Sequence, residues 1–318
     1  MNAVVLDVPA TEESFDEVGY LLANPDVAMA VKRGERKSGL AHFIDIGHRE
    51  RRRMRKTADL AEHRKLKRER ILGILRRNAP FAELDGGCID FLTEDLKKQF
   101  NIVDTTNIAS NVYDEDAKAL IDKYRDGVIL DCGAGRRGMY YGNVVNFEIV
   151  AYDTTDVRGV GEQLPFEDNV FDAVFSLAVL EHVKDPFQCA REIIRVLKPG
   201  GELLCCVPFL QPMHGYPNHY YNMTEQGIRN LFEAGIEISR HEVLPYSYPI
   251  WTLTWILRSW AEGLQGKVKD EFLRMRVSDL VGDAEGYLGR GFVQQLSREK
   301  NFELASGTTI FGVKKLRA

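Results

Sequence analysis

The sequence predicts an α/β protein in which helices cover both faces of a parallel sheet, preceded by a smaller α-helical appendage. Two observations predict this class. From Val128 onward, apolar runs of strand length alternate with helical stretches, which is typical of a parallel sheet buried on both sides. Residues 14–48, by contrast, show only short patterns of helical periodicity. With 318 residues, 44% of them hydrophobic, the chain can bury a core of this size.

Residues 1–80 are expected to form the appendage, and residues 81–318 the α/β domain. In the appendage, Asn24-Pro25-Asp26 begins a helix because proline suits the first helical turn. Ser38-Gly39 separates this helix from the next one. Arg49 to Leu75 is predicted to be one long charged helix.

The α/β domain is expected to open with a short helix at Asp114–Lys123, whose first turn is acidic. Strands and one further helix follow in alternation, and the stretches FELAS and TTIFGVKK near the C-terminus are predicted to pair as a hairpin. The predicted strands are 128–135, 144–152, 171–180 and 202–209, with the helix at 186–197.

The net charge of −5 is unevenly distributed, because residues 49–77 hold thirteen Lys or Arg against four Asp or Glu. Such a basic segment is either a solvated helix or a surface for nucleic acid, anionic lipid or an acidic partner. It has almost no aromatic side chains that could stack on bases, which argues against single-stranded nucleic acid.

Several protein classes are excluded by what the sequence lacks. No apolar run approaches the roughly 18–20 residues that a bilayer crossing needs, and the N-terminus lacks the pattern of a signal peptide. The five cysteines are an odd number without metal-site spacing, so we expect reduced thiols in a cytoplasmic protein and no metal site.

The most informative stretch begins at the first predicted strand of the α/β domain, which runs directly into Asp131-Cys132-Gly133-Ala134-Gly135. Glycines here allow a sharp turn and let a ligand approach the backbone. Glu148 ends the next strand, where a carboxylate can bind both hydroxyls of a ribose. Further along the chain come GEQLPF (161–166), FDAV (171–174), LEHV (180–183) and LKPGG (197–201).

In this order and spacing the motifs resemble those of class I S-adenosylmethionine (SAM)-dependent methyltransferases with a type 11-like domain. The resemblance covers residues 128–237 well, and it implies a doubly wound, mostly parallel, seven-stranded sheet. Residues 245–318 are expected to be a C-terminal helical insertion and hairpin. The cofactor implied is SAM.

The resemblance also implies roles for individual residues. Asp131, Gly133 and Gly135 would form the loop beneath the amino-acid part of SAM, and Glu148 would bind the ribose. The remaining implied contacts are Glu162, Gln163 and Leu164 at the adenine, and Leu177 and Ala178 at the methionine side.

The chain departs from this pattern in two places. Val160 stands where many relatives carry an Asp that reaches the adenine amino group, so adenine recognition falls to backbone groups or to Glu162 and Gln163. The link after the glycines is short, which leaves Asp153, and more weakly Asp156, as rivals for the ribose role. Arg136 and Arg137 follow the loop, where they either contact an anionic group of a ligand or are solvated.

The loop after the fourth strand of the α/β domain concentrates aromatic and imidazole side chains: His214, Tyr216, His219, Tyr220 and Tyr221. In an open α/β sheet such a loop overlooks the ligand crevice. A hydroxyl acceptor must lose a proton, and a histidine suits that role. The candidate bases are therefore His214 and His219, with His182 third, and the candidate acceptor-binding residues are Tyr216, Tyr220 and Tyr221.

Similar loops occur in methyltransferases of surface-polysaccharide gene sets, and the first zone resembles helical modules found beside such domains. The leading hypothesis is therefore O-methylation of a sugar in a glycan or lipid-linked saccharide. The alternatives are another small-molecule acceptor, such as a quinone or lipid precursor, and a non-catalytic partner-binding protein with this fold. The apolar face of Tyr248–Trp260 packs on a core, forms a substrate lid or makes a peripheral membrane contact. The oligomeric state is left open.

Overall fold

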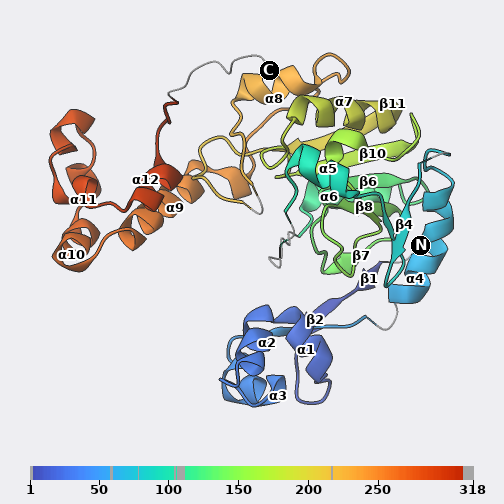
Figure 1. Ribbon diagram of the computed structural model, residues 1–318, viewed down its shortest axis with the longest axis horizontal. Helices are drawn as coiled ribbons and strands as arrows, with labels where there is room; N and C mark the ends of the chain where they lie inside the picture. The colour runs from blue at the N-terminus through green and yellow to red at the C-terminus, as the bar shows by residue number, and fades with distance from the viewer. Residues whose placement is uncertain are drawn as a thin grey trace, which may run out of the picture.

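The computed structural model describes residues 3–57, 60–77, 79–103, 105, 112–215 and 218–310. Figure 1 shows three parts: a central sheet, a small group of helices near the N-terminus, and a helical extension from the other side of the sheet. We name residues 3–57 the N-terminal lobe and residues 245–304 the C-terminal arm.

The central sheet of the described residues has seven strands in the order β11-β10-β6-β8-β9-β5-β4. Every neighbouring pair in it is parallel except β4 and β5. The predicted fold class, a mostly parallel sheet with flanking helices, is confirmed. The strands are β4 (Ala82–Leu84), β5 (Cys88–Asp90), β6 (Ile129–Cys132), β8 (Val144–Glu148), β9 (Val157–Arg158), β10 (Phe171–Leu177) and β11 (Leu197–Cys206).

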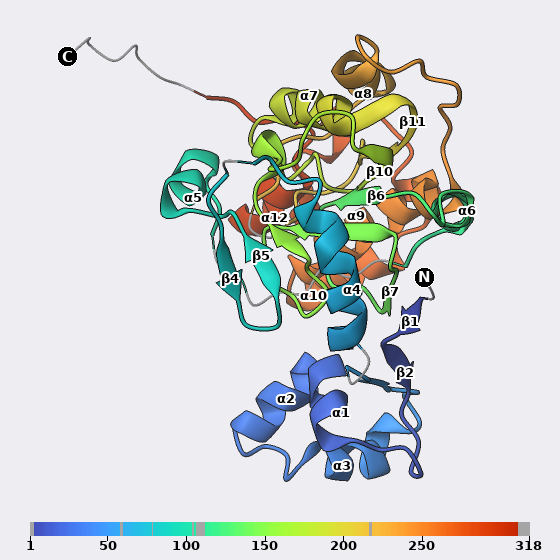
Figure 2. The same ribbon diagram turned by 90° about the vertical axis from the view of Figure 1, so that its right-hand side faces the viewer.

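Alternate residues of the central strands bury opposite faces of the sheet, because successive side chains of a strand point to opposite sides. On one face, Leu130 and Val174 pack with residues of α4 (Leu60–Leu72), α7 (Pro186–Val196) and α8 (Glu225–Phe232). On the other face, Ile129 and Phe175 pack with α6 (Glu115–Lys123). Figure 2 shows α4 crossing in front of the sheet, with α7 and α8 above it. Helix α5 (Glu94–Phe100) follows β5.

Strand order reverses at β6, whose neighbours are β8 on one side and β10 on the other. The ligand crevice of such sheets lies at this switch point, beyond the carboxyl ends of the strands. The link from β6 to β8 contains no helix; it carries the short strand β7 (Met139–Tyr140), which pairs antiparallel with β1 (Val4–Val5). The N-terminal lobe therefore reaches the loop that follows the glycines.

The N-terminal lobe has a small core of its own, made by Tyr20, Val27, Phe43 and Met54. Asn24 precedes α2 and Pro25 is its first residue, as the sequence predicts, and the Ser38 hydroxyl caps α3 by accepting from the Ala41 amide at 3.1 Å. Its helices are α1 (Glu17–Ala23), α2 (Pro25–Lys32) and α3 (Gly39–His42), the last continued by a π-helical turn at Phe43–Gly47, and its strand pair is β2 (Asp7–Pro9) with β3 (Arg53–Arg55).

The basic segment is not one long helix: it contains strand β3 and then α4. Arg55 in β3 is buried because it pairs with Asp7 and Asp153, and Lys67 in α4 is buried because it pairs with Asp156 at 2.5 Å. Ile71 and Leu75 belong to the main core, so a boundary at residue 80 cuts through this core. We propose instead that the boundary lies near residues 57–60.

The C-terminal arm holds α9 (Pro249–Glu262), α10 (Gly266–Arg274), α11 (Gly291–Gln294) and α12 (Arg298–Leu304), and Ala261, Phe272 and Phe292 are in its own core. The predicted hairpin differs from the structure, since Phe302–Leu304 are helical: Ser297 caps α12 and Lys300 pairs with Glu303. Residues 311–318, which hold most of its second strand, lie outside the described residues. Among the helices described, none is long and apolar enough to cross a membrane.

Candidate functional site

A pocket lies at the carboxyl ends of β6, β8 and β10, where the strand order reverses. Five of the residues predicted from the motifs line it: Gly133, Glu148, Glu162, Ala178 and His182. The predicted site is thus assembled from three successive strand ends and the loop before α7.

Gly133 turns the chain at the end of β6 with a φ of +89°, a conformation that favours glycine. A Cβ atom at this position would lie 2.4 Å from a methyl group of Val179, which also lines the pocket. A Gly133→Val exchange therefore clashes with the protein itself, so its effect on a ligand cannot be separated from damage to the loop. Gly135, with a φ of +62°, donates its amide hydrogen to Glu148 at 2.8 Å.

Glu148 ends β8 with its carboxylate at the pocket. One oxygen accepts from the Gly135 amide and the other from the Ile149 amide, at 2.8 and 2.7 Å. Burial raises the pKa of this carboxyl above its ordinary value, while the backbone donors oppose the rise. Each oxygen keeps a second lone pair, so the group is oriented and can still accept hydrogen bonds from a ligand.

Asp131 is fully buried beneath the glycine loop and does not line the pocket. One of its oxygens accepts from the Tyr113 hydroxyl and from two nitrogens of Arg137, at 2.9 and 2.6 Å. Arg137 is therefore buried, and its charge pairs with Asp131 beneath the glycine loop. Arg136 likewise contacts the protein, through Asp153 at 3.4 Å and the Leu22 carbonyl at 2.7 Å.

The two rival acids are engaged elsewhere. Asp153 accepts from the guanidinium of Arg55 with both oxygens. Asp156 forms an ion pair with Lys67 and accepts from the Tyr140 hydroxyl. Neither lines the pocket. Of the three candidate acids, Glu148 is thus the one that lines the pocket.

The three residues predicted at the adenine lie in different places: one lines the pocket, one is exposed and one is in the core. Glu162 lines the pocket and accepts from the amides of Lys184 and Asp185, at 3.1 and 3.3 Å. Burial raises the pKa of its carboxyl. Gln163 is exposed, and Leu164 is buried in the main core.

At the end of β10, Leu177 packs with the core on the α6 side of the sheet, whereas Ala178 lines the pocket. Ala178 has a φ of +55°, uncommon for a residue with a Cβ atom and a feature that clusters at functional sites. Its amide donates to the Cys206 carbonyl at 2.9 Å, which ties this turn to the end of β11.

The three histidines proposed as bases lie together; we call His182, His214 and His219 the histidine cluster. The ring centroids of His182 and His214 are 5.3 Å apart, and those of His214 and His219 are 4.3 Å apart. Burial lowers the pKa of His182, and the other two rings add to this effect. Glu181, beside His182, is fully buried, which raises the pKa of its carboxyl to about 8.

The loop of residues 207–224, which we call the aromatic loop, is fastened to the turn before α7. The amides of Tyr220 and Tyr221 both donate to the Glu181 carbonyl, at 2.7 and 3.2 Å. The Tyr220 hydroxyl bonds to Asn101, and the Tyr221 hydroxyl donates to the Lys184 carbonyl. Neither tyrosine lines the pocket, and Tyr216 lies outside the described residues.

Sequence reasoning missed several lining residues. Ile102 comes from the lead-in before β6, and Asn218 lies in the aromatic loop between the two expected bases. Nothing in the sequence around Ile102 signals a site, whereas Asn218 could have been suspected from its place between His214 and His219. Lys184, after the LEHV motif, also lines the pocket.

With this geometry in view, comparison with known proteins is decisive for one segment. Residues 132–205 match a protein family described as a methyltransferase domain. This segment is thus similar to the domain of that family. It spans the carboxyl end of β6, where the glycine loop begins, through β8 and β10 to β11.

The curated relatives match this chain over a short stretch. Cycloartenol-C-24-methyltransferase 1 of Oryza sativa is 38% identical over 73 residues, which is 23% of this chain and 20% of the relative. A ubiquinone/menaquinone biosynthesis C-methyltransferase of Idiomarina loihiensis is 38% identical over 66 residues, 21% of this chain and 26% of the relative. The chain thus spans about a quarter of the length of these relatives.

Among solved structures, the YcgJ protein of a Bacillus species has a TM-score of 0.33 at 18% identity, covering 54% of this chain and 85% of that one. A methyltransferase in complex with the Trm112 activator of Haloferax volcanii has a TM-score of 0.31 at 21% identity, covering 42% and 81% of the two chains.

Proposed function

We propose that the protein is a SAM-dependent methyltransferase that O-methylates a hydroxyl group, with a sugar of a glycan or lipid-linked saccharide as the acceptor. The observation that carries the proposal is the oriented carboxylate of Glu148, which faces a pocket inside a methyltransferase domain. When bound, SAM supplies a methyl group on a sulfonium centre, and the transfer depends chiefly on positioning.

The residues present fit this cofactor. Glu148 offers two oriented acceptor oxygens to the ribose hydroxyls, and Gly133 keeps the backbone at the pocket free of side-chain atoms. Glu162 is held by backbone amides at the side where adenine is expected, and buried Val160 beside it leaves backbone groups and Glu162 to recognise the base. Exposed Gln163 does not line this pocket.

The surroundings of the histidine cluster favour a hydroxyl acceptor over a quinone. His182, Lys184 and Asn218 line the pocket, and Trp255 of the arm contacts His214 with 5.2 Å between ring centroids. Polar and aromatic groups of this kind bind sugars, whereas a quinone would call for an apolar wall. A quinone stays the alternative acceptor, because Ile102, Ile149 and Val179 give the same pocket an apolar side and one curated relative is a quinone C-methyltransferase.

Two imidazoles are available to take the proton of an acceptor hydroxyl. Carbonyl oxygens only accept, so Nδ1–H of His182 donates to Asn218 and Nδ1–H of His214 donates to Pro212, which leaves both Nε2 atoms as acceptors. In His219, Nδ1 accepts from the His214 amide and Nε2–H donates to Asn222. His219 therefore holds the loop, and we propose His182 or His214 as the base.

Calorimetry with SAM and with its demethylated product tests the proposed cofactor. We expect the wild-type chain to bind both, and Glu148→Gln to weaken binding by roughly 10–100-fold, because hydrogen bonds to a charged group contribute about 1.5–3 kcal/mol. Asp153→Asn is the matched control: it removes a carboxylate that does not line the pocket, so the loss of its pair with Arg55 should lower stability but leave the SAM affinity of the folded protein unchanged. If Asp153→Asn weakens binding more than Glu148→Gln does, we have assigned the wrong acid.

The acceptor is tested by transfer of labelled methyl groups to a panel of lipid-linked and free saccharides, with a demethylated quinone as the competing substrate. Methylation of the quinone alone would refute the sugar proposal.

The peripheral membrane contact stays a prediction. Ile250, Trp251 and Leu253 of α9 are exposed. Sedimentation of the protein with anionic vesicles, and loss of this sedimentation in Trp251→Ala, would test the contact. Buried or half-buried free cysteines are in keeping with the cytoplasmic location that we propose.

A further inference from the structure

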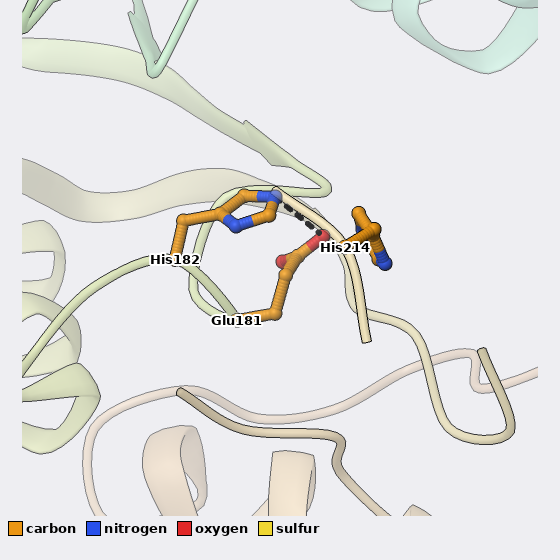
Figure 3. Close-up of side chains that lie close together, drawn as sticks. All are labelled: Glu181, His182 and His214. Atoms are coloured by element: carbon orange, nitrogen blue, oxygen red, sulfur yellow. Dashed lines mark ion pairs between the residues drawn. The ribbon is translucent and has the colours of Figure 1, made fainter. Parts of the chain in front are cut away.

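The carboxylate of Glu181 is buried beside the pocket without a hydrogen-bond partner for either oxygen among the described residues. A buried carboxylate normally has several donors, because its desolvation is costly. The nearest cationic candidate is the His182 ring, whose Nε2 lies 3.8 Å from one oxygen of Glu181 (Figure 3). This distance is too long for a hydrogen bond.

The imidazoles around Glu181 do not supply the missing donor in their neutral forms. His182 and His214 each donate Nδ1–H to a backbone carbonyl, at 2.6 and 2.9 Å. In the neutral ring, the other nitrogen, Nε2, then carries a lone pair and acts as an acceptor. Candidate ligand atoms of Glu181, His182 and His214 all lie within 4.8 Å of one another. Three acceptors thus converge on one point, and no donor of the described residues satisfies Glu181.

We propose that Glu181, His182 and His214 form a binding site for one divalent transition-metal ion at the edge of the pocket. A divalent cation would satisfy all three groups at once, in place of the proton that is favoured on Glu181 because burial raises the pKa of this carboxyl. A tetrahedral ion with bonds of about 2.0–2.1 Å holds its ligands about 3.3 Å apart, so the 3.8 Å between Glu181 and His182 needs only a small closure. This proposal departs from the expectation from the sequence that the protein has no metal site.

The donor set selects the class of metal. Two imidazoles and one carboxylate suit Zn²⁺, Co²⁺, Mn²⁺ or Fe²⁺, whereas Mg²⁺ and Ca²⁺ prefer oxygen ligands. Three protein ligands leave at least one position for water or for an oxygen of another molecule. His182 lines the pocket, so that position can be reached from it.

Backbone contacts around the site resemble those that orient metal ligands. A metal-bound histidine usually donates its second ring N–H to a carbonyl or carboxylate, as both His182 and His214 do here. Gly215 is also constrained: it has a φ of +129°, and a Cβ atom there would lie 2.8 Å from the His182 ring. The loop thus brings His214 to Glu181 only with glycine at this position.

Metal binding does not rest on the proposed transfer reaction and can be measured without it. If an ion occupies the site, the lone pairs of His182 and His214 are used as ligands. A hydroxyl bound to the ion then loses its proton more readily, and the proton passes to solvent.

The test is equilibrium dialysis of the chelator-treated full chain against Zn²⁺, with Co²⁺ absorption in the visible range as the report on ligand type. We expect one tightly bound ion per chain. Glu181→Gln and His214→Ala should each weaken Zn²⁺ binding by at least about 100-fold, since even loss of a residue that supports a ligand costs about 10–100-fold. His241→Ala is the control, because His241 is exposed and outside the cluster.

Glu181→Gln keeps the volume of the side chain, and the thermal unfolding of the metal-free variants shows whether each is folded. Absence of tight binding by the folded wild-type chain overturns the proposal, as does wild-type affinity in folded Glu181→Gln or His214→Ala. SAM calorimetry on the metal-free chain is a separate measurement, so failure of the metal site and failure of the methyltransferase assignment are distinguishable.

Discussion

The N-terminal lobe and the C-terminal arm are both small helical units with cores of their own, but they join the sheet in different ways. The lobe is attached through buried charge: Arg55 reaches Asp153 and the Arg137 carbonyl, just after the glycine loop. The arm is attached near the aromatic loop, where the Met213 amide donates to the Glu303 carbonyl and Trp255 contacts His214. With the function that we propose, the lobe supports the cofactor side of the pocket, and the arm supports the acceptor side.

The two kinds of attachment should affect different properties of the protein: the first its stability, the second its turnover. A buried ion pair that loses one partner leaves an uncompensated charge, which destabilises the whole domain. A half-buried aromatic contact on a loop affects mainly where that loop lies. We therefore expect damage at the lobe's attachment to appear in unfolding, and damage at the arm's attachment to appear in turnover.

The largest expected effect comes from truncation. Deleting residues 1–80 removes α4, and with it Lys67, Ile71 and Leu75, so the remainder should not unfold cooperatively. Deleting residues 245–318 removes no strand of the sheet and should leave a folded domain that still binds SAM. Circular dichroism during heating, with calorimetry for SAM, checks both, and a cooperative Δ1–80 fragment that binds SAM would restore the domain boundary at residue 80.

The second prediction concerns the lobe's attachment. Arg55→Ala should lower the free energy of unfolding by about 3 kcal/mol, because its side chain is buried while Asp7 and Asp153 lose their partner. Urea unfolding measures this. Arg33→Ala, which removes an exposed pair with Glu35 at 3.9 Å, is the control and should cost less than about 0.5 kcal/mol. Equal effects in the two variants would show that the buried pair does not fasten the lobe.

The third and smallest effect is expected at the arm. Trp255→Ala should lower kcat by roughly 10–100-fold, because loss of its contact lets His214 shift and small misplacements are costly in catalysis. SAM affinity and unfolding should change little. Trp251→Ala on the same helix is the matched control, since Trp251 is 59% exposed. Unchanged turnover in Trp255→Ala would mean that the arm has no part in positioning the acceptor loop.

Much of the sheet could be predicted from the sequence because its strands are nearly continuous apolar runs. The runs at 128–135, 144–152 and 171–180 contain β6, β8 and β10, and the helix predicted at 186–197 contains α7. The run at 202–209 overlaps only the second half of β11, which already begins at Leu197. Gly133 and Glu148 could be placed for the same reason, since each immediately follows or ends such a run. Here local pattern and tertiary structure agree.

Other features could not be predicted because they depend on contacts between distant residues. Helical propensity alone favours a single helix that spans the whole basic segment. In the structure, however, Arg55 lies in a strand that pairs with Asp7–Pro9. The charge of Arg137 predicts a solvent-exposed side chain, but the structure buries this side chain because it pairs with buried Asp131. Glu181 carries no sign in the sequence that its carboxylate is left without a donor.

The pairing of β1 with β7 has a consequence for synthesis of the chain. Val4 can pair with Tyr140 only after Tyr140 has left the ribosome. At a synthesis rate of about 5–20 residues per second, this delay is roughly 7–27 s. During that time the lobe can close its own core around Tyr20 and Phe43, but the edge of β1 has no strand to pair with. A nascent chain of this protein thus carries a folded first unit with one unpaired edge until its central sheet emerges.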